Sequence, residues 1–110
     1  MISITQLTVI RDALVPLTDR VYHYWRPKMA APYILWAELN EGQPFYANNK
    51  KAESFWHGTV DLYSKEEFDP LFDKIQEALQ GVEGLTYSLT DAQYEDDTGL
   101  IHHTWEWSLV

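Results

Sequence analysis

Residues 100–109 alternate between two kinds of side chain, and this alternation strongly limits what the chain can fold into. The large, mostly apolar set is Ile101, His103, Trp105, Trp107 and Leu109, and the mostly polar set is Leu100, His102, Thr104, Glu106 and Ser108. Successive side chains of a β-strand point to opposite faces of a sheet, so the spacing predicts a strand. Its two tryptophans would offer an apolar surface to a helix.

The matching helix is predicted over residues 66–80. Its apolar side chains recur as in an amphipathic helix, at Phe68, Leu71, Phe72, Ile75 and Leu79. Ser64 and Glu67 have the spacing of a capping box, and Gly81 is the expected C-terminal cap. Pro70 leaves the start of this helix open, because proline is comfortable only in a first turn.

A first helix is predicted over residues 4–15. Ser3 and Gln6 form a capping box, and Pro16 ends the pattern. Between these two ends the apolar side chains follow helical spacing, at Leu7, Ile10 and Leu14.

Composition and alternation predict further strands over residues 21–25, 33–39, 55–63 and 85–95. A turn ending in Gly99, at positive φ, would join the last two strands into a hairpin over residues 85–109. The polar residues 40–54 are predicted to be a long loop that is mobile in the free protein and orders on docking. The order α-β-β-β-α-β-β predicts an α+β fold, an antiparallel sheet of about four to five strands with two helices on one face.

The chain has 110 residues and a mass of 12.9 kDa, which predicts a single domain over residues 1–110. It has no cysteine, which excludes disulfide scaffolds, cysteine-ligated zinc, iron–sulfur clusters and thiol catalysis. The N-terminus lacks the basic and apolar regions of a signal peptide, and no run approaches the roughly 18 apolar residues of a membrane span. We therefore expect a soluble protein made in the cytoplasm.

The formal charge of −9 is unevenly distributed. Residues 1–55 carry six basic and five acidic side chains, whereas residues 56–110 carry two basic and twelve acidic ones. Without clustered Lys and Arg, binding to nucleic acid or to an anionic membrane is disfavoured. The acidic half is either solvated surface or a charged face, such as an interface or the lumen of an assembly. The candidates for that face are Asp91, Glu95, Asp96 and Asp97.

Catalytic and metal-binding motifs have little support in the sequence. There is no G-x-S-x-G elbow, and residues 81–84 lack the lysine and the further glycines of a phosphate loop. His102 and His103 would point to opposite faces, while a cross-strand meeting of His57 with His103 stays open. We expect no enzyme activity, no metal and no cofactor.

Several aromatic side chains lie in or beside the polar loops, where they either anchor a loop to the core or contact another subunit. Both interpretations stay open. The candidate contact residues are Trp25, Arg26, Phe45, Tyr46, Asn48, Asn49, Lys50, Lys51 and Phe55.

Three segments, in their order and spacing, resemble small phage tail-completion proteins. Val21-Tyr22-His23-Tyr24 with Pro32-Tyr33-Ile34-Leu35-Trp36 is similar to the first strand pair of that family. Val60-Asp61-Leu62-Tyr63-Ser64, before an amphipathic helix, is similar to its centre. Tyr94-Glu95-Asp96-Asp97-Thr98-Gly99-Leu100-Ile101-His102 is similar to its closing hairpin, so the likeness covers residues 20–107.

The resemblance implies a structural virion protein, a tail terminator that forms a ring at the head–tail junction of a phage or prophage. Such a ring is typically a hexamer, and its partners are further copies of itself, the tail tube protein and the head-completion protein. The resemblance implies no catalytic residues, and it places the protein in the host cytoplasm during assembly and then in the tail or neck of the virion. Unlike halves suit the head-to-tail contacts of a ring, and an acidic channel would repel passing DNA.

Two other classes remain as alternatives. A small acidic inhibitor or immunity-type protein, mimicking the charge of DNA, would use a dense acidic stripe and stay monomeric. A ligand-binding or enzymatic module would need a closed apolar pocket with convergent polar groups.

Overall fold

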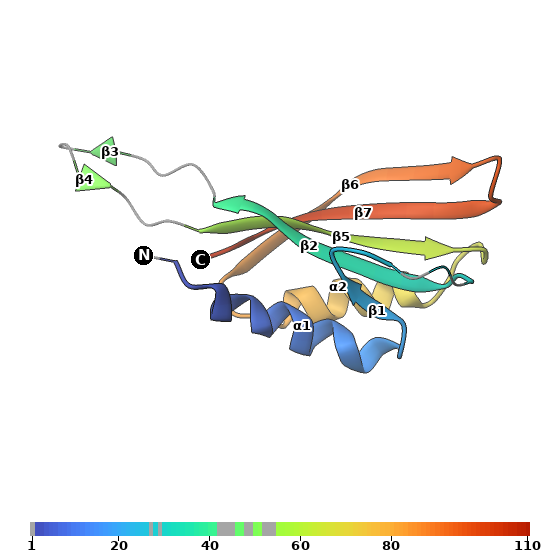
Figure 1. Ribbon diagram of the computed structural model, residues 1–110, viewed down its shortest axis with the longest axis horizontal. Helices are drawn as coiled ribbons and strands as arrows, with labels where there is room; N and C mark the ends of the chain where they lie inside the picture. The colour runs from blue at the N-terminus through green and yellow to red at the C-terminus, as the bar shows by residue number, and fades with distance from the viewer. Residues whose placement is uncertain (1, 27, 29, 42–45, 48–49, 52–54) are drawn as a thin grey trace.

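The computed structural model describes residues 2–26, 28, 30–41, 46–47, 50–51 and 55–110, and of residues 46–47 and 50–51 it describes the backbone alone. It is an α+β fold, with a five-stranded, mostly antiparallel sheet and two helices on one of its faces (Figure 1). The elements are η1 Ile4–Leu7, α1 Thr8–Leu14, η2 Val15–Leu17, β1 Val21–His23, β2 Tyr33–Glu41, β3 Tyr46–Ala47, β4 Lys50–Lys51, β5 Trp56–Ser64, α2 Leu71–Gln80, β6 Leu85–Glu95 and β7 Leu100–Leu109.

The strand order of the main sheet is β1-β2-β5-β7-β6, so β1 and β6 form its two edges. The β6–β7 hairpin is confirmed, and Gly99 in its turn has a φ of 71°. One expectation is wrong, because β1 runs parallel to β2 and the sheet is therefore mixed. Parallel pairing requires the chain to return to the end of the sheet where β1 began. Since β1 has only three residues, roughly 10 Å of strand, the loop between β1 and β2 has to cover only that distance.

The core lies between the sheet and the helices, as the alternation in residues 100–109 predicts. Trp105 and Trp107 are fully buried there, and Trp105 donates a hydrogen bond from Nε1 to Gln76 of α2 at 3.1 Å. Val60 and Leu62 of β5 share this face, and Gly58 leaves room for the ring of Trp107. The sheet and both helices therefore bury one continuous apolar layer.

The first helical segment is confirmed, with Ser3 and Gln6 forming the expected capping box before η1. The second helix begins later than predicted, at Leu71 instead of residue 66. Ser64 and Glu67 do not cap it. The Asp69 carboxylate accepts a hydrogen bond from the Leu71 amide at 2.9 Å, and the Ser64 hydroxyl donates to the same carboxylate at 2.6 Å.

The predicted loop over residues 40–54 is partly wrong. Strand β2 continues to Glu41, and β3 pairs with β4 as a separate two-stranded hairpin. This hairpin extends from the end of the sheet opposite to the β6–β7 turn (Figure 1). The other residues of the predicted loop lie outside the described part of the chain, so its expected mobility stays a prediction.

Candidate assembly surface

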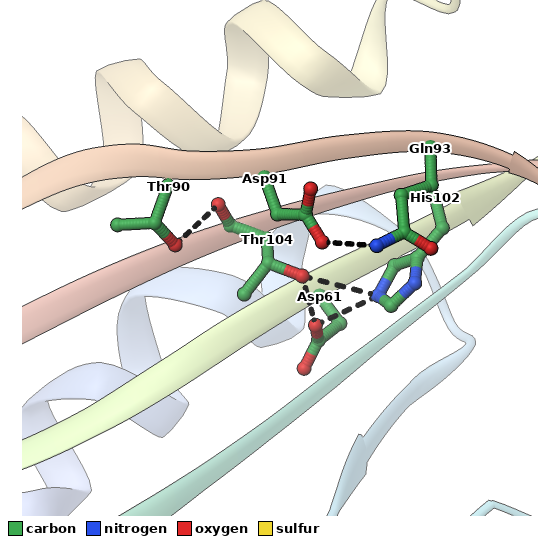
Figure 2. A network of polar contacts seen from close by, with 6 residues as sticks. All are labelled: Asp61, Thr90, Asp91, Gln93, His102 and Thr104. Carbon is green, nitrogen blue, oxygen red and sulfur yellow. Dashed lines mark hydrogen bonds and ion pairs between the residues drawn. The ribbon is translucent and has the colours of Figure 1, made fainter.

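The sheet has an open face, since no helix or strand of the described chain covers the side opposite to α1 and α2 (Figure 1). In the middle of this face, Asp61 of β5 accepts two hydrogen bonds, from His102 Nε2 at 2.8 Å and from the Thr104 hydroxyl at 2.7 Å. Figure 2 shows these three side chains converging between β5 and β7. The network joins neighbouring strands through half-buried polar groups, which favours a structural role.

This arrangement differs from that of a nucleophile, a base and an acid. In such a triad one ring nitrogen of the histidine faces the nucleophile and the other faces the acid. Here Nε2 of His102 faces both groups, at 2.8 Å from Asp61 Oδ1 and 3.2 Å from the Thr104 hydroxyl. The geometry therefore gives His102 no path for carrying a proton from Thr104 to Asp61.

Beside this network, aromatic rings continue across the open face. Tyr33 stacks on Tyr63 with ring centroids 4.8 Å apart, and Tyr63 stacks on His102 at 4.0 Å. The Arg26 guanidinium lies 5.2 Å from the centroid of Tyr33 and 5.7 Å from that of Tyr63. Burial is the main reason that the pKa of Tyr63 rises to about 12, and burial also raises the pKa of Tyr33. These phenols are neutral at physiological pH, so they add no negative charge to the open face.

Asp91 and Gln93 of the edge strand β6 lie on the same open face, where the Gln93 amide donates to the Asp91 carboxylate at 2.5 Å (Figure 2). A bulge at Thr90 precedes them, and the Thr90 hydroxyl donates to the backbone carbonyl of Thr104 at 3.3 Å. Because a bulge adds one residue, it changes which face the following side chains occupy. It thereby turns Asp91 toward the open face.

The β1 edge carries an exposed aromatic segment. The ring of His23 stacks between Trp36, at 3.9 Å, and Tyr24, at 4.0 Å. Tyr24 also donates from its hydroxyl to Glu38, and its backbone has a φ of 73°. Trp25 follows and is 70% exposed. The anchored pair therefore holds the next residue, Trp25, at the surface.

Phe68 lies on the helix side of the sheet, in the segment between β5 and α2. Its side chain was expected on the buried face of the helix, but it is 90% exposed and its backbone has a φ of 62°. A bulky residue in the left-handed region is strained, and such strain often marks a functional site. The Asp69–Pro70 pair was the available signal, because a helix beginning there leaves Phe68 outside it.

This strain leads to a prediction about stability. Replacing Phe68 with glycine removes about 1–2 kcal/mol of left-handed strain and restores about 0.5–1 kcal/mol of unfolded-state freedom. We expect Phe68→Gly to raise the free energy of unfolding by about 0.5–1 kcal/mol in urea titrations. Phe68→Ala keeps the Cβ atom and should give no such gain, and an equal gain from both variants would contradict the assigned strain.

His103 lies on the helix side of β7, where its Nδ1 is buried without a hydrogen-bond partner among the described residues. Its ring meets the edge of Phe72 at 4.8 Å. Burial lowers its pKa, and the neighbouring charge of His102 lowers it further. His57 is on the open face, 3.6 Å from Glu106, so the structure does not bring His57 and His103 together.

The lowered pKa of His103 predicts a pH dependence of folding. Below the ordinary value of 6.5 the unfolded chain takes up the proton first, so acidification lowers the free energy of unfolding until the folded pKa is passed. His103→Phe has no group that titrates at this position, so the free energy of unfolding of the variant should lack this part of the decrease on acidification. We expect the difference in urea midpoint between wild type and variant to change from pH 8 to pH 5, and a constant difference would contradict the prediction.

The predicted contact residues do not form one described surface. Trp25 and Arg26 lie on the loop after β1, while Phe55 is half-buried just before β5. Tyr46, Lys50 and Lys51 belong to the small hairpin, and Phe45, Asn48 and Asn49 lie outside the described residues.

The four predicted acidic residues lie closer together. Asp91 and Glu95 are on β6, and the exposed Asp96 and Asp97 follow in the turn after it. All four therefore occupy the β6 edge and its tip.

No group of histidine and acidic residues in the described chain is arranged to hold a metal ion. None of the described helices is long and apolar enough to cross a membrane. A comparison with models of known protein families finds no match, and neither does a comparison with curated proteins.

Proposed function

We propose that this chain is a structural virion subunit, a tail terminator that assembles into a ring at the head–tail junction of a phage or prophage. The observation that carries the proposal is the difference between the two edges of the sheet. Proteins that form rings contact each other head to tail, through two different patches on each subunit. A single sheet with unlike edges supplies two such patches.

The β1 edge is aromatic and basic. Trp25 is exposed there, and Arg26 and Lys28 follow it on the same loop. The β6 edge is acidic and ends in the turn that holds Asp96 and Asp97. The two edges therefore carry opposite charges, which favours unlike contacts over like ones.

The resemblance of three sequence segments to tail-completion proteins supports the same function. It adds the proposed partners, which are the tail tube protein on one side of the ring and a head-completion protein on the other. Acidic side chains of the β6 edge that lie outside the subunit contact would repel passing DNA.

Light scattering on a sizing column, over a range of protein and salt concentrations, tests this function. A discrete oligomer near six subunits that appears as a ring in negative-stain images is the expected result. Raising the salt concentration should weaken it, because contacts between exposed charges are screened. A protein that stays monomeric at every concentration and titrates a basic partner would instead be the acidic inhibitor.

A further inference from the structure

A cavity of about 380 Å³ lies between the segment before α2 and the first half of β7. Its apolar wall includes Phe68, Phe72 and Ile101, and its rim carries Glu66, Glu67 and Asp73. The volume is at the lower end of the roughly 300–1,000 Å³ typical of binding pockets. An aromatic side chain would fit against the apolar wall, and positively charged neighbours would complement the acidic rim.

The chain presents an aromatic side chain with basic neighbours at the β1 edge of the sheet. Trp25 is 70% exposed and is followed by the basic residues Arg26 and Lys28. We propose that the Trp25 side chain of one subunit inserts into the cavity beside Phe68 of the next, with Lys28 facing its acidic rim. This inference rests on the proposed ring and specifies its subunit contact.

Backbone strain marks both surfaces. Tyr24 and Phe68 are the residues other than glycine with positive φ in the described chain, at 73° and 62°. Both are aromatic and exposed, and each belongs to one of the two surfaces. Tyr24 is held by its ring stacking and its hydroxyl contact, whereas the 90% exposure of Phe68 leaves its ring few partners inside the subunit. A neighbouring subunit would supply those partners.

The sheet topology gives this contact a direction. Trp25 follows the edge strand β1, and a second hollow lined by Tyr94 and Ala92 of the other edge strand, β6, adjoins the cavity through Ile101 and Glu67. The donor surface therefore lies at the β1 edge and the acceptor cavity on the half of the sheet that ends in β6, so they are two different patches of one subunit. Repeating such a contact adds each subunit in the same sense, and it closes into a ring when the rotation allows.

Cross-linking tests the contact directly, because the natural chain has no cysteine. Lys28→Cys and Glu67→Cys place one exposed thiol beside each surface and keep both Trp25 and Phe68. We expect a short bis-maleimide to join the two variants when they are mixed. The yield should be at least about tenfold higher than for Lys28→Cys mixed with Leu39→Cys, an exposed control position on β2.

Adding Trp25→Ala to the Lys28→Cys chain should lower that yield by about tenfold or more, because tryptophan anchors carry much of the energy of an interface. Efficient cross-linking of Lys28→Cys to itself would overturn the inference, since it indicates a two-fold contact. So would a yield unchanged by Trp25→Ala, since Trp25 would then not be the side chain that enters the cavity.

The outcomes also separate this inference from the proposed function. A ring that forms without cross-linking between the mixed variants leaves the function standing and removes the contact. Cross-linked pairs of the mixed variants, with no ring at any concentration, keep the contact and remove the ring. A solution with neither ring nor cross-link overturns both.

Discussion

Gly58→Ala should lower the free energy of unfolding by about 3 kcal/mol or more. A Cβ atom at this position of β5 would lie 2.3 Å from the Ala37 carbonyl oxygen and 2.3 Å from Cζ2 of Trp107. Both neighbours are fixed, because one is backbone inside the sheet and the other is a fully buried ring. Relief would require β5 to separate from β2, or Trp107 to leave the core.

Urea unfolding followed by tryptophan fluorescence measures this loss. Gly81→Ala is the matched control, since the nearest atoms to its added Cβ are at 3.6 Å and its φ is an ordinary −77°. That variant should change stability by less than about 0.5 kcal/mol. If Gly58→Ala lowered the free energy of unfolding no more than Gly81→Ala does, the close packing of the Trp107 ring against Gly58 would be contradicted.

The second large effect is expected from Asp61→Ala. This carboxylate is 16% exposed and accepts hydrogen bonds from both His102 and Thr104 (Figure 2). Removing it leaves two half-buried donors without their acceptor, which costs about 2 kcal/mol. Thermal and urea unfolding should both show the loss.

Asp91→Ala provides the comparison for that variant. Asp91 lies on the same face but is exposed and contacts Gln93. Its removal should therefore stay within about 0.5 kcal/mol of wild type. Equal effects at the two positions would indicate that the network does not stabilise the sheet, and a role in binding would then explain Asp61 better.

Much of the fold could be predicted because its signals are local. The alternation in residues 100–109 identified the buried face of β7, and Ser3 with Gln6 identified the start of the first helix. These signals depend on neighbouring side chains alone. The pairing direction of β1 depends instead on the path of the loop between β1 and β2. The three residues of β1 do not indicate whether the strand pairs parallel or antiparallel.

The candidate site was only half visible in the sequence. Trp25 stood out as an aromatic residue among polar neighbours, and it is exposed. The exposure of Phe68 could not be predicted from periodicity, because its spacing from Leu71 and Phe72 fits a helix that includes it. The helix begins only after Pro70 and leaves Phe68 outside. Helical periodicity reports where side chains would point if the helix were present. It does not report where the helix begins.

The stability and the assembly of this protein should respond in opposite ways to one change. Phe68→Gly relieves backbone strain while it removes part of the cavity wall. If that strain is retained for binding, the more stable variant should also be the one that fails to assemble. This combination distinguishes a binding role for Phe68 from a folding role.

The mass of mixed variants, measured by native mass spectrometry, tests head-to-tail assembly most directly. Trp25→Ala disables one surface and Phe68→Gly the other, so each variant alone should stay monomeric while wild type forms its ring. Mixed together they retain one intact contact per pair, and the account predicts a 1:1 dimer that grows no further. Rings from either variant alone, or a mixture that contains only monomers, would contradict it.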